Sequence, residues 1–330
     1  MRRIAVVQRE ARLVANPTKP EKYLDLYAIV PTALSSPWDP TTHAYTPDYP
    51  LLEALIDVKV QSGDAFDPQT GALAAATNVW VATELRRAGI EADRVWPRRD
   101  APRTLTWDAA AARAKVKIRR NPKQLPPHWN VTGPVSKADL ISIQEHAIEL
   151  FLTEMGKGPA VPGNSANILG GHFPKEIDVS MARYDRGLEL GVSTKTMIRE
   201  PTKNIPNRRE EASGDLLNIR RRFPLSAFGY FFLLEHGISQ TSGHFGKIVD
   251  MCRKVSLPMP GDQNHYTASC LIVAEIHQTP PTTKLHPTVA PRDLGAEQFF
   301  TALIDTLMER SQGGDHREAR QLWEAAGRAP

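Results

Sequence analysis

The sequence lacks several features that would assign a protein to a class at once. Only two of its 330 residues are cysteines, Cys252 and Cys270, which is too few for a disulfide framework or for a zinc site made by cysteines alone. No apolar run approaches the length that crosses a bilayer, and the apolar stretch near Met1 is too short for a signal peptide. We therefore expect a cytoplasmic protein with reduced thiols and no membrane partner.

Strong charge of one sign and internal repeats are also missing. The net charge is +4, a mildly basic balance that permits a polyanionic partner such as nucleic acid but does not require one. The chain is long enough for one large domain or two smaller ones. Four prolines within residues 122–134 predict a boundary there, between an N-terminal region (1–130) and a second domain (131–330).

Regular helix and strand patterns alternate after this boundary. Strands separated by single helices pair in parallel through right-handed crossovers, whereas strands joined by a tight turn pair as a hairpin. The sequence therefore predicts an α/β fold whose mixed sheet has a hairpin at one side and parallel strands at the other. The expected elements are a helix at 77–89, a helix from Ser136 to about Phe151, hairpin strands at 177–181 and 188–197, helices at 207–222, 242–255 and 296–310, and strands at 227–234 and 270–276.

Three polar residues of the expected hairpin converge on one patch. A turn centred near residues 185–186 sets Asp178 opposite Ser193, and strand alternation puts Ser193 and Lys195 on one face with Glu189. A slip of one residue in this register would move Asp178 to the other face. A carboxylate that binds Mg²⁺ beside a lysine that orients or deprotonates water suits phosphodiester hydrolysis. An ordinary salt bridge between Asp178 and Lys195 is the simpler alternative.

A second carboxylate is needed, because Mg²⁺ is usually bound through one or two carboxylates in proteins. The neighbouring helices offer several, although acids near a helix start also favour the helix dipole and acids one turn apart often form a solvated face. The candidates are Glu210 and Glu211 on the following helix, Glu145 and Glu149 on the preceding helix, and Glu189 on the strand itself.

The spacing of these residues resembles a known signature. Pro174-x-x-x-Asp178, followed fifteen residues later by Ser193-Thr-Lys195, looks like the PD-(D/E)XK motif of type II restriction endonucleases. Ser193 stands where the family usually has Asp or Glu, which resembles a subgroup whose second acid is displaced onto the next helix. The segment from Lys203-Asn204 to Glu211 is similar to the KN-x-x-NR-x-x-E stretch that follows the catalytic lysine in some of these families.

The resemblance covers about residues 136–310 and implies a restriction-endonuclease-like core of αβββαβ type flanked by helices. It also implies a double-stranded DNA endonuclease that depends on Mg²⁺, with Mn²⁺ as a substitute, and that acts as a homodimer with a separately encoded methyltransferase. In such an enzyme the N-terminal region (1–130) would recognise or clamp the DNA duplex. The implied roles are Asp178 as metal ligand, Lys195 as catalytic lysine, Ser193 at the substituted position, Glu211 as displaced acid with Glu210 as second choice, and Glu149 as a further metal ligand.

Clustered basic residues are candidates for contacts with DNA phosphates, although a solvated basic face explains them equally well. A nuclease that recognises DNA structure or context, or an inactive DNA-binding protein with this fold, also stays open. The candidate DNA-binding residues are Arg98, Arg99, Arg113, Lys117, Arg119, Arg120, Lys203 and Arg208.

The ten histidines give no metal-binding motif. His244 and His265 lack the spacing of metal ligands, and no zincin-like or His-Asn-His pattern is present. The sequence therefore predicts that the histidines are structural or lie on the surface. Trp96, close to the basic cluster, is expected to belong to the core.

Overall fold

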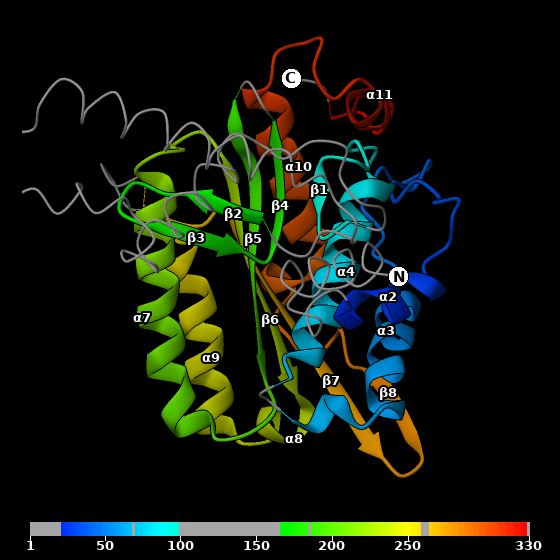
Figure 1. The fold of residues 1–330 in the computed structure, drawn as a ribbon, viewed down its shortest axis with the longest axis vertical. Helices are drawn as coiled ribbons and strands as arrows, with labels where there is room; N and C mark the ends of the chain where they lie inside the picture. Colours follow the sequence, from blue (N-terminus) through cyan, green and yellow to red (C-terminus); the bar gives the residue numbers. More distant parts are fainter. Residues whose placement is uncertain (1–20, 68–69, 99–165, 184–185, 259–263, 329–330) are drawn as a thin grey trace, which may run out of the picture.

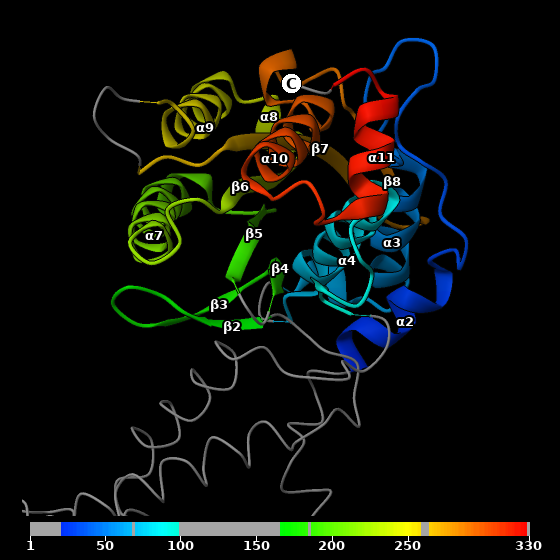
Figure 2. The same ribbon diagram turned by 90° about the horizontal axis from the view of Figure 1, so that it is seen from above.

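A computed structural model describes residues 21–67, 70–98, 166–183, 186–258 and 264–328 of the chain. These residues form a six-stranded mixed sheet, a separate two-stranded sheet and helices on both faces of the larger sheet (Figures 1 and 2). The prediction of a mixed α/β fold is confirmed. The helix expected from Ser136, and with it Glu145 and Glu149, lies outside the described residues. Within those residues no helix is both long and apolar enough to cross a membrane.

The predicted elements that lie within the described residues follow one another in the predicted order, with further strands and helices between and around them. The strands are β1 (Val95–Trp96), β2 (Ala166–Leu169), β3 (Pro174–Ile177), β4 (Val179–Arg183), β5 (Gly187–Met197), β6 (Ala227–Glu235), β7 (Ala268–Gln278) and β8 (Pro281–Leu285). The helices are α2 (Glu21–Ile29), α3 (Tyr49–Gln61), α4 (Ala72–Arg87), α7 (Pro201–Arg220), α8 (His236–Ser239), α9 (Ser242–Val255), α10 (Ala296–Arg310) and α11 (Arg317–Ala325).

The sheet has the order β1-β4-β5-β6-β7-β8. Strands β4 and β5 pair as an antiparallel hairpin, and β5, β6 and β7 are parallel, as predicted. The antiparallel edge strands β1 and β8 were not predicted. Strand β1 has only two residues, and β8 has the sequence Pro-Thr-Thr-Lys-Leu, so neither carries the hydrophobic alternation that identifies a strand.

Two hydrophobic clusters lie on opposite faces of the sheet, because successive side chains of a strand point to opposite faces. Leu190 and Val192 of β5 pack under α3, α4 and α10, whereas Tyr230 and Phe232 of β6 pack under α7 and α9. Figures 1 and 2 show α7 and α9 together on one side and α3, α4 and α10 on the other. The sheet is therefore covered on both faces, as parallel strands require.

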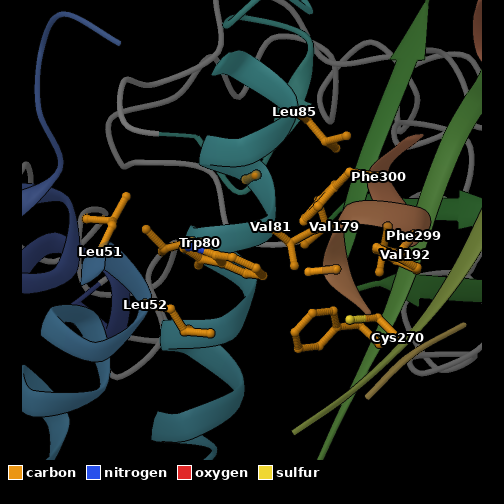
Figure 3. Packing of buried hydrophobic residues seen from close by; sticks show 14 of the residues in the cluster. Leu51, Leu52, Trp80, Val81, Leu85, Val179, Val192, Cys270, Phe299 and Phe300 are labelled. Atoms are coloured by element: carbon orange, nitrogen blue, oxygen red, sulfur yellow. The ribbon is translucent and has the colours of Figure 1, made fainter. Parts of the chain in front are cut away.

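The N-terminal helices belong to the same core as the strands. Trp80 of α4 is fully buried, and its ring lies 5.5 Å from the ring of Phe300 on α10 and 5.7 Å from that of Phe231 on β6. Figure 3 shows Trp80 with Val192 and Cys270 of the sheet in this cluster. The predicted boundary near residue 130 lies outside the described residues, and residues 21–98 share their core with residues 166–328.

Helix α7 begins at Pro201, six residues before the predicted start at Asn207. Two prolines, Pro201 and Pro206, lie in the added segment without preventing the helix. Pro201 suits the first helical position, where no N–H is needed, and Pro206 removes only one backbone hydrogen bond close to the same end. The longer helix brings Lys203 and Arg208 onto the same element as Glu211.

Candidate active site

The β4–β5 hairpin brings Asp178 next to Ser193, as the turn predicted. Val179 pairs with Val192, so the same register extended by one residue sets Asp178 opposite Ser193. The backbone N–H of Thr194 donates a hydrogen bond to Asp178 Oδ2 at 3.0 Å. The expected continuous strand at 177–181 is wrong in one respect, because β3 and β4 are separate strands and Asp178 occupies the bend between them.

Ser193 and Lys195 point to the face of β5 that α7 covers. Both side chains are buried, and Lys195 Nζ lies 2.8 Å from Glu211 Oε1 on α7. Thr194, between them, points the other way and donates from its hydroxyl to Asn78 Oδ1 on α4. Strand alternation therefore acts here as predicted, and the lysine is directed into the layer between the sheet and α7.

Glu211 is the acid of α7 that joins this layer. Its second oxygen, Oε2, accepts a hydrogen bond from Arg208 NH1 at 2.6 Å. Burial alone would raise the pKa of Glu211, but Lys195 and Arg208 outweigh burial and lower it. Glu210, the second choice, is exposed one position earlier on the helix. Arg208, one of the candidate DNA contacts, pairs with Glu211 in this structure.

Asp178 differs from Glu211 in its ionisation. Burial raises the pKa of the Asp178 carboxyl, and the charge of Lys195 and the N–H of Thr194 offset only part of this effect. The carboxyl therefore holds its proton to a higher pH than a solvated aspartate does. Any cation that Asp178 binds must compete with this proton.

Asp215 was missed by the sequence analysis. It lies one turn after Glu211 on α7, and its Oδ1 forms an ion pair with Lys175 Nζ of β3 at 2.7 Å. Its other oxygen, Oδ2, and the hydroxyl of Tyr230 are buried without a hydrogen-bond partner among the described residues. The spacing Glu211-x-x-x-Asp215 was visible as one helix face, but nothing in it showed that this face is buried.

Two sets of contacts hold α7 over the sheet. Asn218 Oδ1 accepts from the backbone N–H of Phe173 at 3.1 Å, and its Nδ2 donates to the carbonyl oxygen of the same residue at 3.0 Å. Gly170 faces this amide so closely that an added Cβ would lie 2.3 Å from it. The buried hydroxyl of Tyr266 donates to the carbonyl of Ala212 at 3.1 Å. The β2–β3 ribbon before Asp178 is thus tied to the helix that carries Glu211.

Glu189 does not join the site. A β-bulge between Met181 and Ala182 interrupts the alternation of the hairpin, so Leu188 packs in the cluster under α7 whereas Leu190, two residues later, packs on the opposite face. Glu189 Oε2 lies 3.6 Å from His316 Nε2, and its carboxylate also approaches two arginines of the hairpin. The prediction that Glu189 shares the face of Lys195 is therefore wrong, because the bulge reverses the order of faces at this point.

The basic candidates fall into three groups. Arg98 is buried, with its guanidinium carbon 4.5 Å from the centre of the buried Trp96 ring, and burial lowers the pKa of Arg98 to about 10. This position does not suit contact with a DNA phosphate. Lys203 is exposed near the start of α7. The remaining candidates lie outside the described residues: Arg99, Arg113, Lys117, Arg119 and Arg120.

A histidine cluster that the sequence analysis did not find is also present. One ligand atom from each of His236, Glu275 and His286 lies within 4.8 Å of the others. These residues are 39 and 11 positions apart in the chain, so no local spacing could have revealed them. Only the pairing of β6, β7 and β8 brings them together. In the part of the chain that the structure describes, this is the one such group of three metal-binding side chains.

Comparisons with family models, with curated proteins and with solved structures found no match for this chain.

The chemistry of the site around Lys195 follows from its own residues. Asp178 and Glu211 supply carboxylate oxygens, which are the ligands that Mg²⁺ prefers, and two carboxylates are sufficient for this ion. The carboxylate oxygens of Asp178, Glu211 and Asp215 do not all lie within 4.8 Å of one another, so Asp215 is not counted in this donor set. Lys195 supplies a cation that contacts one of these acids directly. The donor set thus fits a hard divalent cation next to a fixed ammonium group.

Proposed function

We propose that the chain is a Mg²⁺-dependent endonuclease of the PD-(D/E)XK type that hydrolyses double-stranded DNA. One observation carries the proposal. The resemblance selected three residues that lie on a bend, a strand and a helix: Asp178, Lys195 and Glu211. In the structure Lys195 contacts Glu211 directly, and the backbone N–H of Thr194, the residue before Lys195, holds Asp178.

The order of elements around the site supports the same proposal. An antiparallel hairpin carries the aspartate and the lysine, the next helix carries the displaced acid, and the following strand is parallel to the second hairpin strand. This order resembles the αβββαβ core that the sequence resemblance implies, and it therefore supports the proposal. Ser193, at the position usually held by an acid, is buried beside Tyr230, its register partner on β6.

The residues can be given separate roles in phosphodiester hydrolysis. Asp178 and Glu211 would hold Mg²⁺, which when bound stabilises the negative charge that develops on the scissile phosphate. Lys195 is kept close to the acids by its ion pair, where its ammonium orients the attacking water and offsets charge on the phosphate. Arg208, which shares Glu211, is available to a phosphate when Glu211 binds the metal instead.

The proposed substrate class is duplex DNA read at a specific site. A homodimer would match the two-fold symmetry of a palindromic site and cut both strands, and a separate methyltransferase would protect the host sequence. Exposed Lys203, on the same helix as Arg208, is available to the DNA backbone.

The test is digestion of methylation-free plasmid and phage DNA with and without Mg²⁺. Asp178→Ala and Lys195→Ala should abolish cleavage. Glu211→Gln and Glu210→Gln form a matched pair, since both remove one charge from adjacent positions of α7 but only Glu211 contacts Lys195. We expect Glu211→Gln to lower the cleavage rate at least about 100-fold and Glu210→Gln to leave it within about threefold.

The outcomes separate the alternatives. Discrete metal-dependent fragments support the site-specific enzyme, and a smear supports a nuclease that responds to structure or context. Intact DNA from several sources in Mg²⁺ and in Mn²⁺, with duplex binding retained, would replace the proposal with an inactive DNA-binding protein. Equal rates for the two glutamate variants would remove Glu211 from the site.

A further inference from the structure

The cluster of His236, Glu275 and His286 is assembled from three elements of the sheet. His236 is the first residue of α8, directly after β6, Glu275 lies on β7, and His286 follows the edge strand β8. The backbone N–H of His286 donates to the carbonyl of Val273 at 2.8 Å, which fixes this residue against β7. Figure 1 shows α8 at the end of the sheet that β7 and β8 also reach.

Its side chains already contact one another. His286 Nε2 lies 3.0 Å from Glu275 Oε2, and the rings of His236 and His286 are stacked with their centres 4.2 Å apart. All three side chains are partly exposed, so an ion can reach them from solvent.

Neighbouring polar groups orient His236. Gln240 Nε2 lies 3.1 Å from His236 Nε2, and the hydroxyl of Ser239 lies 3.5 Å from His236 Nδ1. One ring nitrogen can therefore bind an ion while the other keeps a side-chain partner, which is the usual arrangement of a histidine ligand. His277 Nε2, 3.2 Å from the second oxygen of Glu275, offers a further nitrogen at the rim of the cluster.

We propose that His236, Glu275 and His286 bind one divalent transition-metal ion, with Zn²⁺ as the best fit to two imidazoles and one carboxylate. Mg²⁺ is excluded as the resident of this cluster, since it takes oxygen ligands. Zn²⁺ accepts this set and leaves a fourth position for water or for His277. The ion joins the end of β6 to β7 and to the chain after β8, and so fastens the edge strand to the sheet.

This site is distinct from the one around Lys195 and does not depend on the nuclease proposal. Lys195 pairs with Phe232 on β6, and His236 lies four residues further along the chain. At about 3.3 Å per strand residue, roughly 13 Å along the sheet separates the two levels. The two sites also differ in chemistry, because Asp178 and Glu211 offer oxygens only.

The experiment is calorimetric titration of the untagged, metal-stripped full chain with Zn²⁺ at neutral pH. We expect about one strong equivalent for the wild type, and at least a tenfold loss of affinity in the His236→Ala/His286→Ala double variant and in Glu275→Gln. His172→Ala, which removes an exposed histidine of the β2–β3 turn, should titrate like the wild type, as should Asp178→Ala. Substitution with Co²⁺ gives a second readout, because imidazole ligation produces visible absorption that the double variant should lose.

Either of two results would overturn the proposal. The first is a wild type without a strong equivalent of Zn²⁺, and the second is a double variant that binds Zn²⁺ as tightly as the wild type while its circular dichroism shows it to be folded. If the double variant fails to fold, Glu275→Gln decides, because it keeps the shape of the side chain and removes only the charged ligand. Loss of Zn²⁺ binding in Asp178→Ala would also count against the site, since it would put the ion beside Lys195.

Discussion

His316 makes the stability of the folded chain depend on pH. The residue precedes α11, and its fully buried side chain has Nδ1 2.8 Å from Glu91 Oε2 and Nε2 3.6 Å from Glu189 Oε2. Burial alone would lower the pKa of this imidazole, but the two carboxylates outweigh burial and raise the pKa to about 9. The protonated ring therefore joins the segment before α11 to β5 and to the chain that follows α4.

The sign and size of the effect follow from this pKa. In the unfolded chain the pKa of the imidazole is 6.5, so the folded protein holds the proton more tightly. The resulting stabilisation is complete below about pH 6.5 and is lost as the pH rises through about 9. The full difference in pKa corresponds to about 3 kcal/mol. Since the 3.6 Å contact with Glu189 is too long for a hydrogen bond, we expect about 2 kcal/mol.

The assay is urea unfolding of the wild type and of His316→Gln between pH 6 and pH 10. The variant should be less stable at pH 6, and the difference in free energy of unfolding should shrink by about 2 kcal/mol toward pH 10. His172→Gln, at an exposed position, controls for the loss of a solvated imidazole. A difference between His316→Gln and wild type that stays constant over the whole range would refute the reasoning.

Two further predictions concern the site and the core. Lys195→Met removes the cation that lowers the pKa of Asp178, so the carboxyl of the variant should take up its proton at a higher pH. As the pH is lowered, Mg²⁺ binding measured by calorimetry should therefore weaken at a higher pH in the variant than in the wild type. An unchanged pH dependence would contradict the proposed role of Asp178. Gly229→Ala would set a Cβ 2.7 Å from ring atoms of Phe299 and should lower the free energy of unfolding in urea by about 1–3 kcal/mol. Gly214→Ala, in open space on α7, should raise it by about 0.5–1 kcal/mol. Similar effects of both changes would contradict the close packing of β6 on α10.

Local pattern was sufficient for the central elements. The apolar run from Ala227 predicts β6, which is buried on both faces between two parallel neighbours, and the helical spacing of 242–255 and 296–310 predicts α9 and α10 with the observed bounds. The register that sets Asp178 opposite Ser193 followed from the position of one turn. These features are determined by residues close in the chain, so a sequence read in short windows contains them.

Tertiary packing alone decided which polar residues meet. Periodicity left both Glu210 and Glu211 open, and only a motif resemblance favoured Glu211. The placement of α7 on the sheet is what directs Glu211 to Lys195. The β-bulge in the hairpin, which no local pattern predicted, directs Glu189 away from the site and toward His316. The cluster around His236 likewise depends on strand pairing between residues far apart in the chain. Periodicity determines the direction of a side chain relative to its own element, whereas its partner depends on how whole elements pack.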